Sequence, residues 1–168
     1  MIGKITTLLL MIGGMILMPT DTEAAEKKVE NAELLAISMI AKYEGFSPKV
    51  YVCPGGKKTI GYGFTNPSLI AKGTITRKEA DYELGKEVRK RLAVIRKHCK
   101  GLTPRQEAAA CSLMYNIGES AFLNSTFLKK LKANDLVNAR AEIKRWNKSG
   151  GKVLAGLVKR RNAEAAWI

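Results

Sequence analysis

Residues 44–63 read EGFSPKVYVCPGGKKTIGYG, and this stretch decides the fold class. Two runs rich in β-branched and aromatic residues, 50–53 and 58–63, flank a Pro-Gly-Gly turn, which predicts a small β-hairpin. The preceding segment, 33–44, has apolar residues at helical spacing, and Gly45 is a typical stop for such a helix. A helix therefore gives way to a hairpin directly after Glu44.

The rest of the chain indicates helices. Thr76 and Thr103 each begin a capping box, which predicts a long helix from Arg77 to about Cys99 and a second helix from Pro104. Shorter helical runs follow near 126–133, 135–146 and 156–167. With 168 residues and 46% hydrophobic content, the chain suits one ordinary globular domain. We expect an α+β, mainly α fold in which a long helix joins a small hairpin lobe to a helical lobe.

The first 25 residues have the organisation of an export signal. Lys4 precedes an uncharged run of 16 residues, 5–20, which is shorter than the roughly 20 needed to cross a bilayer but suits the apolar part of a signal peptide. Two alternatives stay open: an uncleaved membrane tether through residues 5–20, or a buried N-terminal helix. We expect 1–25 to be a signal peptide or signal anchor, 26–168 to be the catalytic domain, and the protein to be periplasmic or extracellular.

The chain is strongly basic, with 29 Lys+Arg against 15 Asp+Glu and a net charge of +14. Such a charge predicts an anionic polymer or surface as partner. Export removes the protein from nucleic acid, so the bacterial wall and envelope are the better candidates. The sequence has no cluster of metal-binding residues and no phosphate-binding glycine loop, so we expect no metal and no cofactor. We also expect a monomer.

Glu44 is the only acid between Glu33 and Glu79. A carboxylate at the C-terminal end of a helix faces the negative end of the helix dipole, which favours its protonated form, and burial acts in the same direction. The general acid of a glycosidase needs that property to protonate the leaving oxygen of a sugar–sugar bond. The alternative is an ordinary solvated glutamate at a helix end.

The spacing around Glu44 adds a family resemblance. Cys53 follows Glu44 after eight residues and Thr59 follows Cys53 after five, and this pattern resembles the phage-type lysozymes, the endolysins of glycoside hydrolase family 24. Residues 115–126 and 145–164 resemble two further blocks of that family, so the resemblance covers essentially everything after residue 30. It implies a lysozyme-like two-lobed fold and a muramidase that hydrolyses the β-1,4 bond between N-acetylmuramic acid and N-acetylglucosamine in peptidoglycan.

The resemblance also implies roles for these residues. Glu44 would be the acid, Cys53 the second catalytic group, and Thr59 the holder of the attacking water. Glycosidases commonly use two carboxylates, so the thiol of Cys53 departs from the commoner pattern. A free thiol is mostly protonated at neutral pH. Whether Cys53 acts as base, nucleophile, electrostatic group or small buried residue stays open, and Thr59 also suits a strand for structural reasons alone.

Two further expectations concern side chains outside this trio. Asn116, Asn124 and Ser125 are candidates for substrate binding, with helix capping as the alternative for the asparagines. Cys99 and Cys111 fall on the apolar faces of consecutive predicted helices, so in an oxidising compartment we expect them to form a disulfide.

Two other functions remain open from the sequence. A lytic transglycosylase works with a single glutamate and leaves a 1,6-anhydro end, whereas a hydrolase leaves a new reducing end. A cationic protein that disrupts wall or membrane without catalysis would make Glu44 incidental. The sequence does not decide between phage lysis and bacterial wall remodelling.

Overall fold

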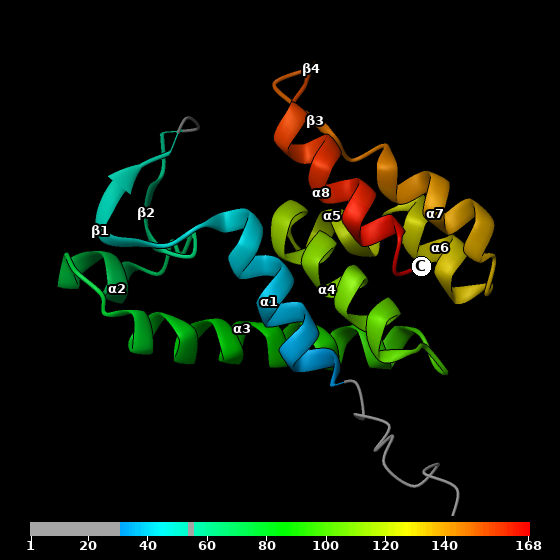
Figure 1. Cartoon of the computed structure of the whole chain (residues 1–168), viewed down its shortest axis with the longest axis horizontal. Coiled ribbons are helices and arrows are strands. Elements are labelled where there is room, and N and C mark those ends of the chain that lie inside the picture. Colours follow the sequence, from blue (N-terminus) through cyan, green and yellow to red (C-terminus); the bar gives the residue numbers. More distant parts are fainter. Residues whose placement is uncertain (1–30, 54–55) are drawn as a thin grey trace, which may run out of the picture.

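The computed structural model describes residues 31–53 and 56–168 (Figure 1). The expected signal segment, 1–25, lies outside the described residues. The elements in chain order are α1 (Ala32–Glu44), β1 (Ser47–Val52), β2 (Lys58–Gly61), α2 (Pro67–Lys72), α3 (Arg77–His98), α4 (Pro104–Ile117), α5 (Glu119–Leu123), α6 (Thr126–Lys132), α7 (Leu136–Lys144), β3 (Lys148–Ser149), β4 (Lys152–Val153) and α8 (Ala155–Ala165).

Local hydrogen bonds explain where the main helices begin and end. The Asn31 side chain accepts from two backbone N–H groups at the start of α1, and Gly45 ends that helix at φ 69°. Thr76 with Glu79 and Thr103 with Gln106 form the two expected capping boxes, at the starts of α3 and α4. These predicted helix starts are confirmed.

The predicted hairpin is also confirmed, although β1 begins earlier than expected, at Ser47. β1 and β2 pair antiparallel, with Tyr51 opposite Thr59 and Val52 opposite Lys58. Three short pieces were not predicted: α2, α5, and the hairpin formed by β3 and β4. Each of these helices and strands has six residues or fewer, which is too short for a repeat of apolar positions to be recognised in the sequence.

Figure 1 shows the two parts of the fold, with α3 running beneath both. The hairpin and α2 lie at one end, where α2 packs on β2. At the other end α4 is central and contacts α1, α3, α5 and α8, while α7 packs between α6 and α8. The mainly α, lysozyme-like fold class expected from the sequence is correct. Among the described residues, no helix is both long and apolar enough to cross a bilayer.

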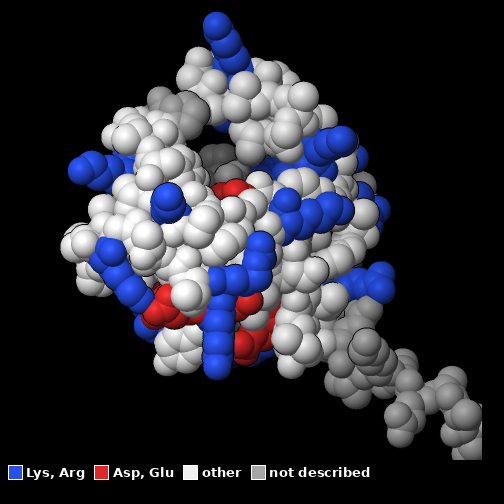
Figure 2. Space-filling view, turned by 60° about the vertical axis from the view of Figure 1, so that its left-hand side comes forward, with Lys and Arg blue, Asp and Glu red and all other residues white. Residues whose placement is uncertain are grey.

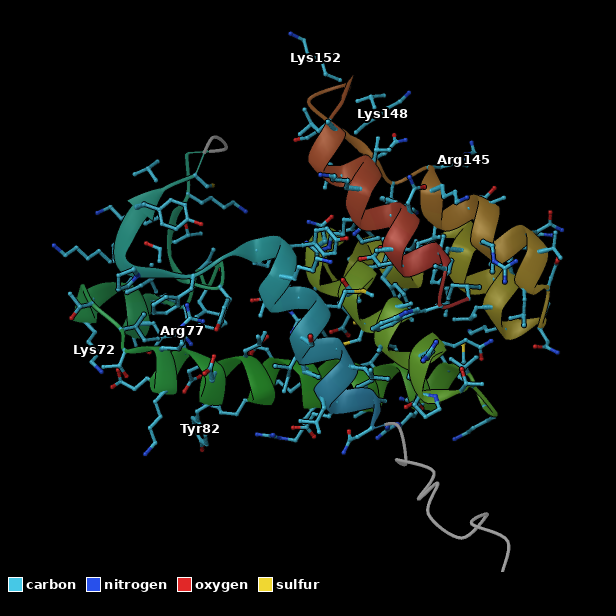
Figure 3. The ribbon with its side chains drawn as sticks, in the orientation of Figure 1. Lys72, Arg77, Tyr82, Arg145, Lys148 and Lys152 are labelled. Atoms are coloured by element: carbon cyan, nitrogen blue, oxygen red, sulfur yellow. The ribbon has the colours of Figure 1, made fainter. Side chains whose placement is uncertain are left out.

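Basic side chains are scattered over the face of the molecule that Figure 2 shows. Figure 2 shows Lys and Arg around a hollow in one face, with acidic atoms at its edge. Lys148 and Lys152 extend outward from the hairpin of β3 and β4, and Arg145 precedes it (Figure 3). The charge is therefore presented on the outside of the fold, where it can attract an anionic polymer.

Candidate active site

Glu44 lies where three parts of the fold converge. It is the last residue of α1, and its side chain is 21% exposed. Oε1 accepts a hydrogen bond from Nη1 of Arg160, on α8, at 2.6 Å. On the hairpin side the backbone comes so close that a Cβ added at Gly63 would lie 3.3 Å from Oε2. Glu44 therefore lies at the helix–hairpin junction, as the sequence predicts, and its side chain is partly buried.

Arg160 belongs to a buried polar cluster beneath Glu44. Arg160 is 3% exposed, and its Nε lies 3.1 Å from Oε1 of Glu164, which has no exposed surface. Nη2 donates to the backbone oxygen of Ser112 on α4 at 3.1 Å. The cluster connects α8 to α4 directly behind the candidate acid.

Arg161 extends this cluster toward the cleft. Its Nη2 donates to Oε1 of Glu164 at 2.8 Å, and its Nη1 donates to Oδ1 of Asn116 at 3.1 Å. Burial raises the pKa of the Glu164 carboxyl, while the two arginines and Ser112 oppose that shift. Asn116, expected from the sequence to bind substrate, is thus oriented by a buried arginine and remains exposed at the surface.

Tyr115 links the helical lobe to the hairpin lobe. Its hydroxyl donates to the backbone oxygen of Tyr62 at 2.8 Å, and the Arg91 guanidinium lies 4.8 Å from the centre of its ring. Burial, and secondly the negative charge of Glu44, raise the pKa of Tyr115. Tyr115 therefore stays a neutral hydrogen-bond donor at physiological pH. It lies close enough to Glu44 for the two groups to interact electrostatically.

A cavity of about 550 Å³ opens between the two lobes, and Glu44 is not itself among the residues that line it. Gly63 lines it, and Gly63 is the residue whose backbone closely approaches the Glu44 carboxylate. The lining comes from the hairpin lobe, from α3, and from the end of α4: Lys57, Gly63, Phe64, Thr65, Asn66 and Leu69; Glu83, Glu87 and Arg91; Tyr115, Asn116, Ile117 and Gly118. A groove with polar groups from both sides suits a chain of hydroxylated sugars.

Thr59 and Cys53 lie on the hairpin, as expected. Thr59 is buried in β2, and its hydroxyl donates to the backbone oxygen of Tyr51 at 3.4 Å. Cys53 directly follows β1, is half-buried, and its N–H donates to the backbone oxygen of Lys57 at 2.9 Å. Neither Cys53 nor Thr59 is among the residues that line the cavity.

Asn124 and Ser125 serve as helix caps. The Ser125 hydroxyl is buried, donates to the backbone oxygen of Phe122 at 2.7 Å, and accepts from the Leu128 N–H at 3.1 Å. Asn124 ends α5, and its amide donates to the backbone oxygen of Ser120 at 2.9 Å. Neither lines the cavity, so of the three expected substrate-binding residues only Asn116 lies there.

The cysteines are free thiols in the structure, and the Cys99–Cys111 disulfide expected from the sequence is not formed in it. Sγ of Cys111 instead lies 3.9 Å from the backbone oxygen of Val88, on α3. Burial raises the pKa of Cys111 to about 12 and also raises that of Cys99. Both thiols are therefore protonated and chemically inert in the fold.

Within residues 31–53 and 56–168, no group of three His, Cys, Asp or Glu is placed to hold a metal ion.

Sequence reasoning missed Arg160, Glu164 and Ser112, the residues that support Glu44. Arg160 and Glu164 fall within the block 145–164 that resembles the family, and Ser112 is a serine within the apolar run of α4, but neither signal says that these side chains are buried. Charged residues are almost never fully buried unless paired, so these positions looked like surface.

A two-lobed, mainly helical fold with a carboxylate at the cleft between its lobes defines a glycoside hydrolase of the lysozyme class. Residues 41–164 match the model of the phage lysozyme family, and the chain belongs to that family. It is a peptidoglycan-hydrolysing lysozyme, a muramidase.

Three known proteins illustrate the relationship. The endolysin of Acyrthosiphon pisum secondary endosymbiont phage 1 is 41% identical over 133 residues, covering 76% of this chain and 90% of that protein. The SAR-endolysin of Enterobacteria phage P21 is 32% identical over 122 residues, covering 72% of this chain and 74% of that protein. The muramidase domain of SpmX from Asticaccaulis excentricus superimposes with a TM-score of 0.71 at 27% identity, covering 79% of this chain and 92% of that chain.

Proposed function

We propose that Glu44 is the general acid of this muramidase. The observation that carries the proposal is the position of its carboxylate: partly exposed, at the junction of both lobes, and beside the cleft. In this role Glu44 gives its proton to the oxygen of the β-1,4 bond as that bond breaks. Water adds to the anomeric carbon of N-acetylmuramic acid and releases one proton to the solvent, and the product carries a new reducing end.

Cys53 and Thr59 are proposed to act on the water molecule that attacks the anomeric carbon. Both lie on the hairpin that follows Glu44, which is the side of the cleft opposite the helical lobe. A thiol or thiolate at Cys53 would stand where the family's commoner members have a carboxylate. The Thr59 hydroxyl would hold the water, exchanging its contact to Tyr51 for one to that water. Asn116 is proposed to bind the sugar or its N-acetyl group from the α4 side.

Residues 1–25 are proposed to export the chain, with 5–20 holding it transiently at the membrane. Similarity to proteins named SAR-endolysins supports export, and the net charge of +14 suits an anionic envelope. Fractionation of cells that express the full chain tests this: the chain should appear in the membrane or periplasmic fraction. Recovery in the cytoplasmic fraction alone would overturn the proposal.

The role of Glu44 is tested by clearing of a suspension of purified peptidoglycan. Glu44→Gln should be slower than the wild type by about 100-fold or more, because the amide has no transferable proton. Glu142→Gln is the matched control, since Glu142 pairs with Arg145 on α7, away from the cleft residues. It should clear the suspension at the wild-type rate. Activity of Glu44→Gln above a tenth of wild type would remove Glu44 from this role.

A further inference from the structure

We propose that Glu164 and Ser112 are positioning residues for the catalytic carboxylate, because together they fix the guanidinium of Arg160 that holds Oε1 of Glu44. The inference rests on the proposed role of Glu44 as general acid. According to this inference, a buried cluster in the helical lobe positions the group that reacts in the cleft.

The geometry leaves Arg160 little freedom. Its Nε lies 3.1 Å from Oε1 of Glu164 and 3.3 Å from Oγ of Ser112. Its Nη2 donates to the Ser112 backbone oxygen at 3.1 Å and to Oγ at 3.2 Å. The planar guanidinium is therefore held along one edge, and Nη1 is left to donate to Glu44 at 2.6 Å.

Glu164 and Ser112 are themselves locked together. The Ser112 hydroxyl donates to Oε1 of Glu164 at 2.6 Å, and neither residue has exposed surface. Arg161, which is 1% exposed, fixes the carboxylate from the other side, with its Nε 2.7 Å from Oε2. Movement of any member would thus shift Arg160, and with it the carboxylate of Glu44.

Stability alone does not account for such a cluster. Removing charged groups from water costs free energy that their mutual attraction often fails to recover, and apolar side chains of similar volume serve a core as well or better. Here the cluster reaches from a fully buried carboxylate to a partly exposed one at the cleft. We attribute the buried charges to this role: they hold Arg160 as a fixed hydrogen-bond donor to Glu44.

The test measures kcat and KM on purified peptidoglycan for the full chain and three variants: Glu164→Gln, Ser112→Ala and the control Glu142→Gln. Glu164→Gln should lower kcat roughly 10- to 100-fold with KM within about twofold, since a misplaced catalytic group costs about this much. Ser112→Ala should lower kcat in the same sense by a smaller factor, and Glu142→Gln should behave as the wild type.

A purely structural role would change the folded fraction, but not kcat per folded molecule. Thermal unfolding gives the folded fraction of each variant. If Glu164→Gln does not fold, the kcat of Ser112→Ala decides the question. Wild-type kcat per folded molecule in the folded variants would overturn the inference while leaving Glu44 in its role. An inactive wild type, or an active Glu44→Gln, would instead overturn the proposed function.

Discussion

Oε1 of Glu44 lies 2.6 Å from Nη1 of Arg160, although the two residues are 116 positions apart in the chain. The contact joins the end of α1, where the hairpin begins, to the last helix of the helical lobe. It places a buried cation against Oε1 of the candidate acid, whose side chain stays 21% exposed.

The first prediction compares the stability of two Glu→Gln variants. Glu44→Gln should lower the free energy of unfolding by no more than about 1 kcal/mol, because its amide oxygen still accepts from Arg160, which keeps Glu164 as partner. Glu164→Gln should cost more, about 2 kcal/mol or above, because two buried arginines lose their shared carboxylate. Urea unfolding followed by circular dichroism measures both. Equal losses would mean that Arg160 does not depend on Glu164.

The second prediction concerns Cys53. Cys53→Ala should stay folded and lose most activity, whereas Cys53→Asp should keep substantial activity, since a carboxylate restores the commoner chemistry. Cys53→Asp should also resist iodoacetamide, which should inactivate the wild type. Peptide mapping of the treated native chain should find label on half-buried Cys53 and none on buried Cys99 or Cys111. Wild-type activity in Cys53→Ala would make the thiol a packing residue and favour a single-glutamate transglycosylase.

The third prediction uses a pair of glycines. Gly63 has φ 84° and lies against Oε2 of Glu44, whereas Gly73 has φ 78° and open space around its Cα. Alanine strains the backbone similarly at both, by about 1–2 kcal/mol. Only Gly63→Ala should also crowd the catalytic carboxylate and lower kcat about tenfold or more. Similar kcat values for the two variants would show that backbone strain, and not contact with Glu44, causes the effect.

The fourth prediction concerns stability in acid. The Lys72 ammonium and hydrogen bonds from Thr76 lower the pKa of Glu79 to about 2. The unfolded chain releases this proton only near pH 4.3, so the carboxylate stabilises the fold above that pH and loses its effect as the pH falls to about 2. Glu79→Gln should therefore lower Tm at pH 7 and leave it unchanged at pH 2. A Tm loss of the same size at both pH values would contradict this account.

The helix starts, the hairpin and the helix–hairpin junction can be predicted from local sequence patterns. Capping boxes at Thr76 and Thr103 give the helix starts, and the Pro-Gly-Gly turn gives the hairpin. Glu44, Cys53 and Thr59 fall within 16 consecutive residues, so their placement around one helix–hairpin junction follows from local patterns. Ser125 caps α6, and a serine before a helix suits such a cap as readily as a sugar contact, so the sequence pattern does not distinguish the two roles.

The support for Glu44 depends on tertiary contacts that no local pattern contains. Ser112 and Glu164 are 52 residues apart and meet only when α4 packs on α8. Buried charges at Arg160, Arg161 and Glu164 also run against the usual preference of charged residues for the surface. Periodicity and propensity therefore place α8, but they do not reveal which of its charged side chains lie inside.

Mass spectrometry of the fragments released from purified peptidoglycan tests the central claim most directly. The full chain, purified in detergent, should release muropeptides that end in a reducing N-acetylmuramic acid, and Glu44→Gln should release almost none. Reduction with borohydride before analysis marks such ends by their gain in mass. Fragments with 1,6-anhydro ends, or release that survives Glu44→Gln, would contradict the account.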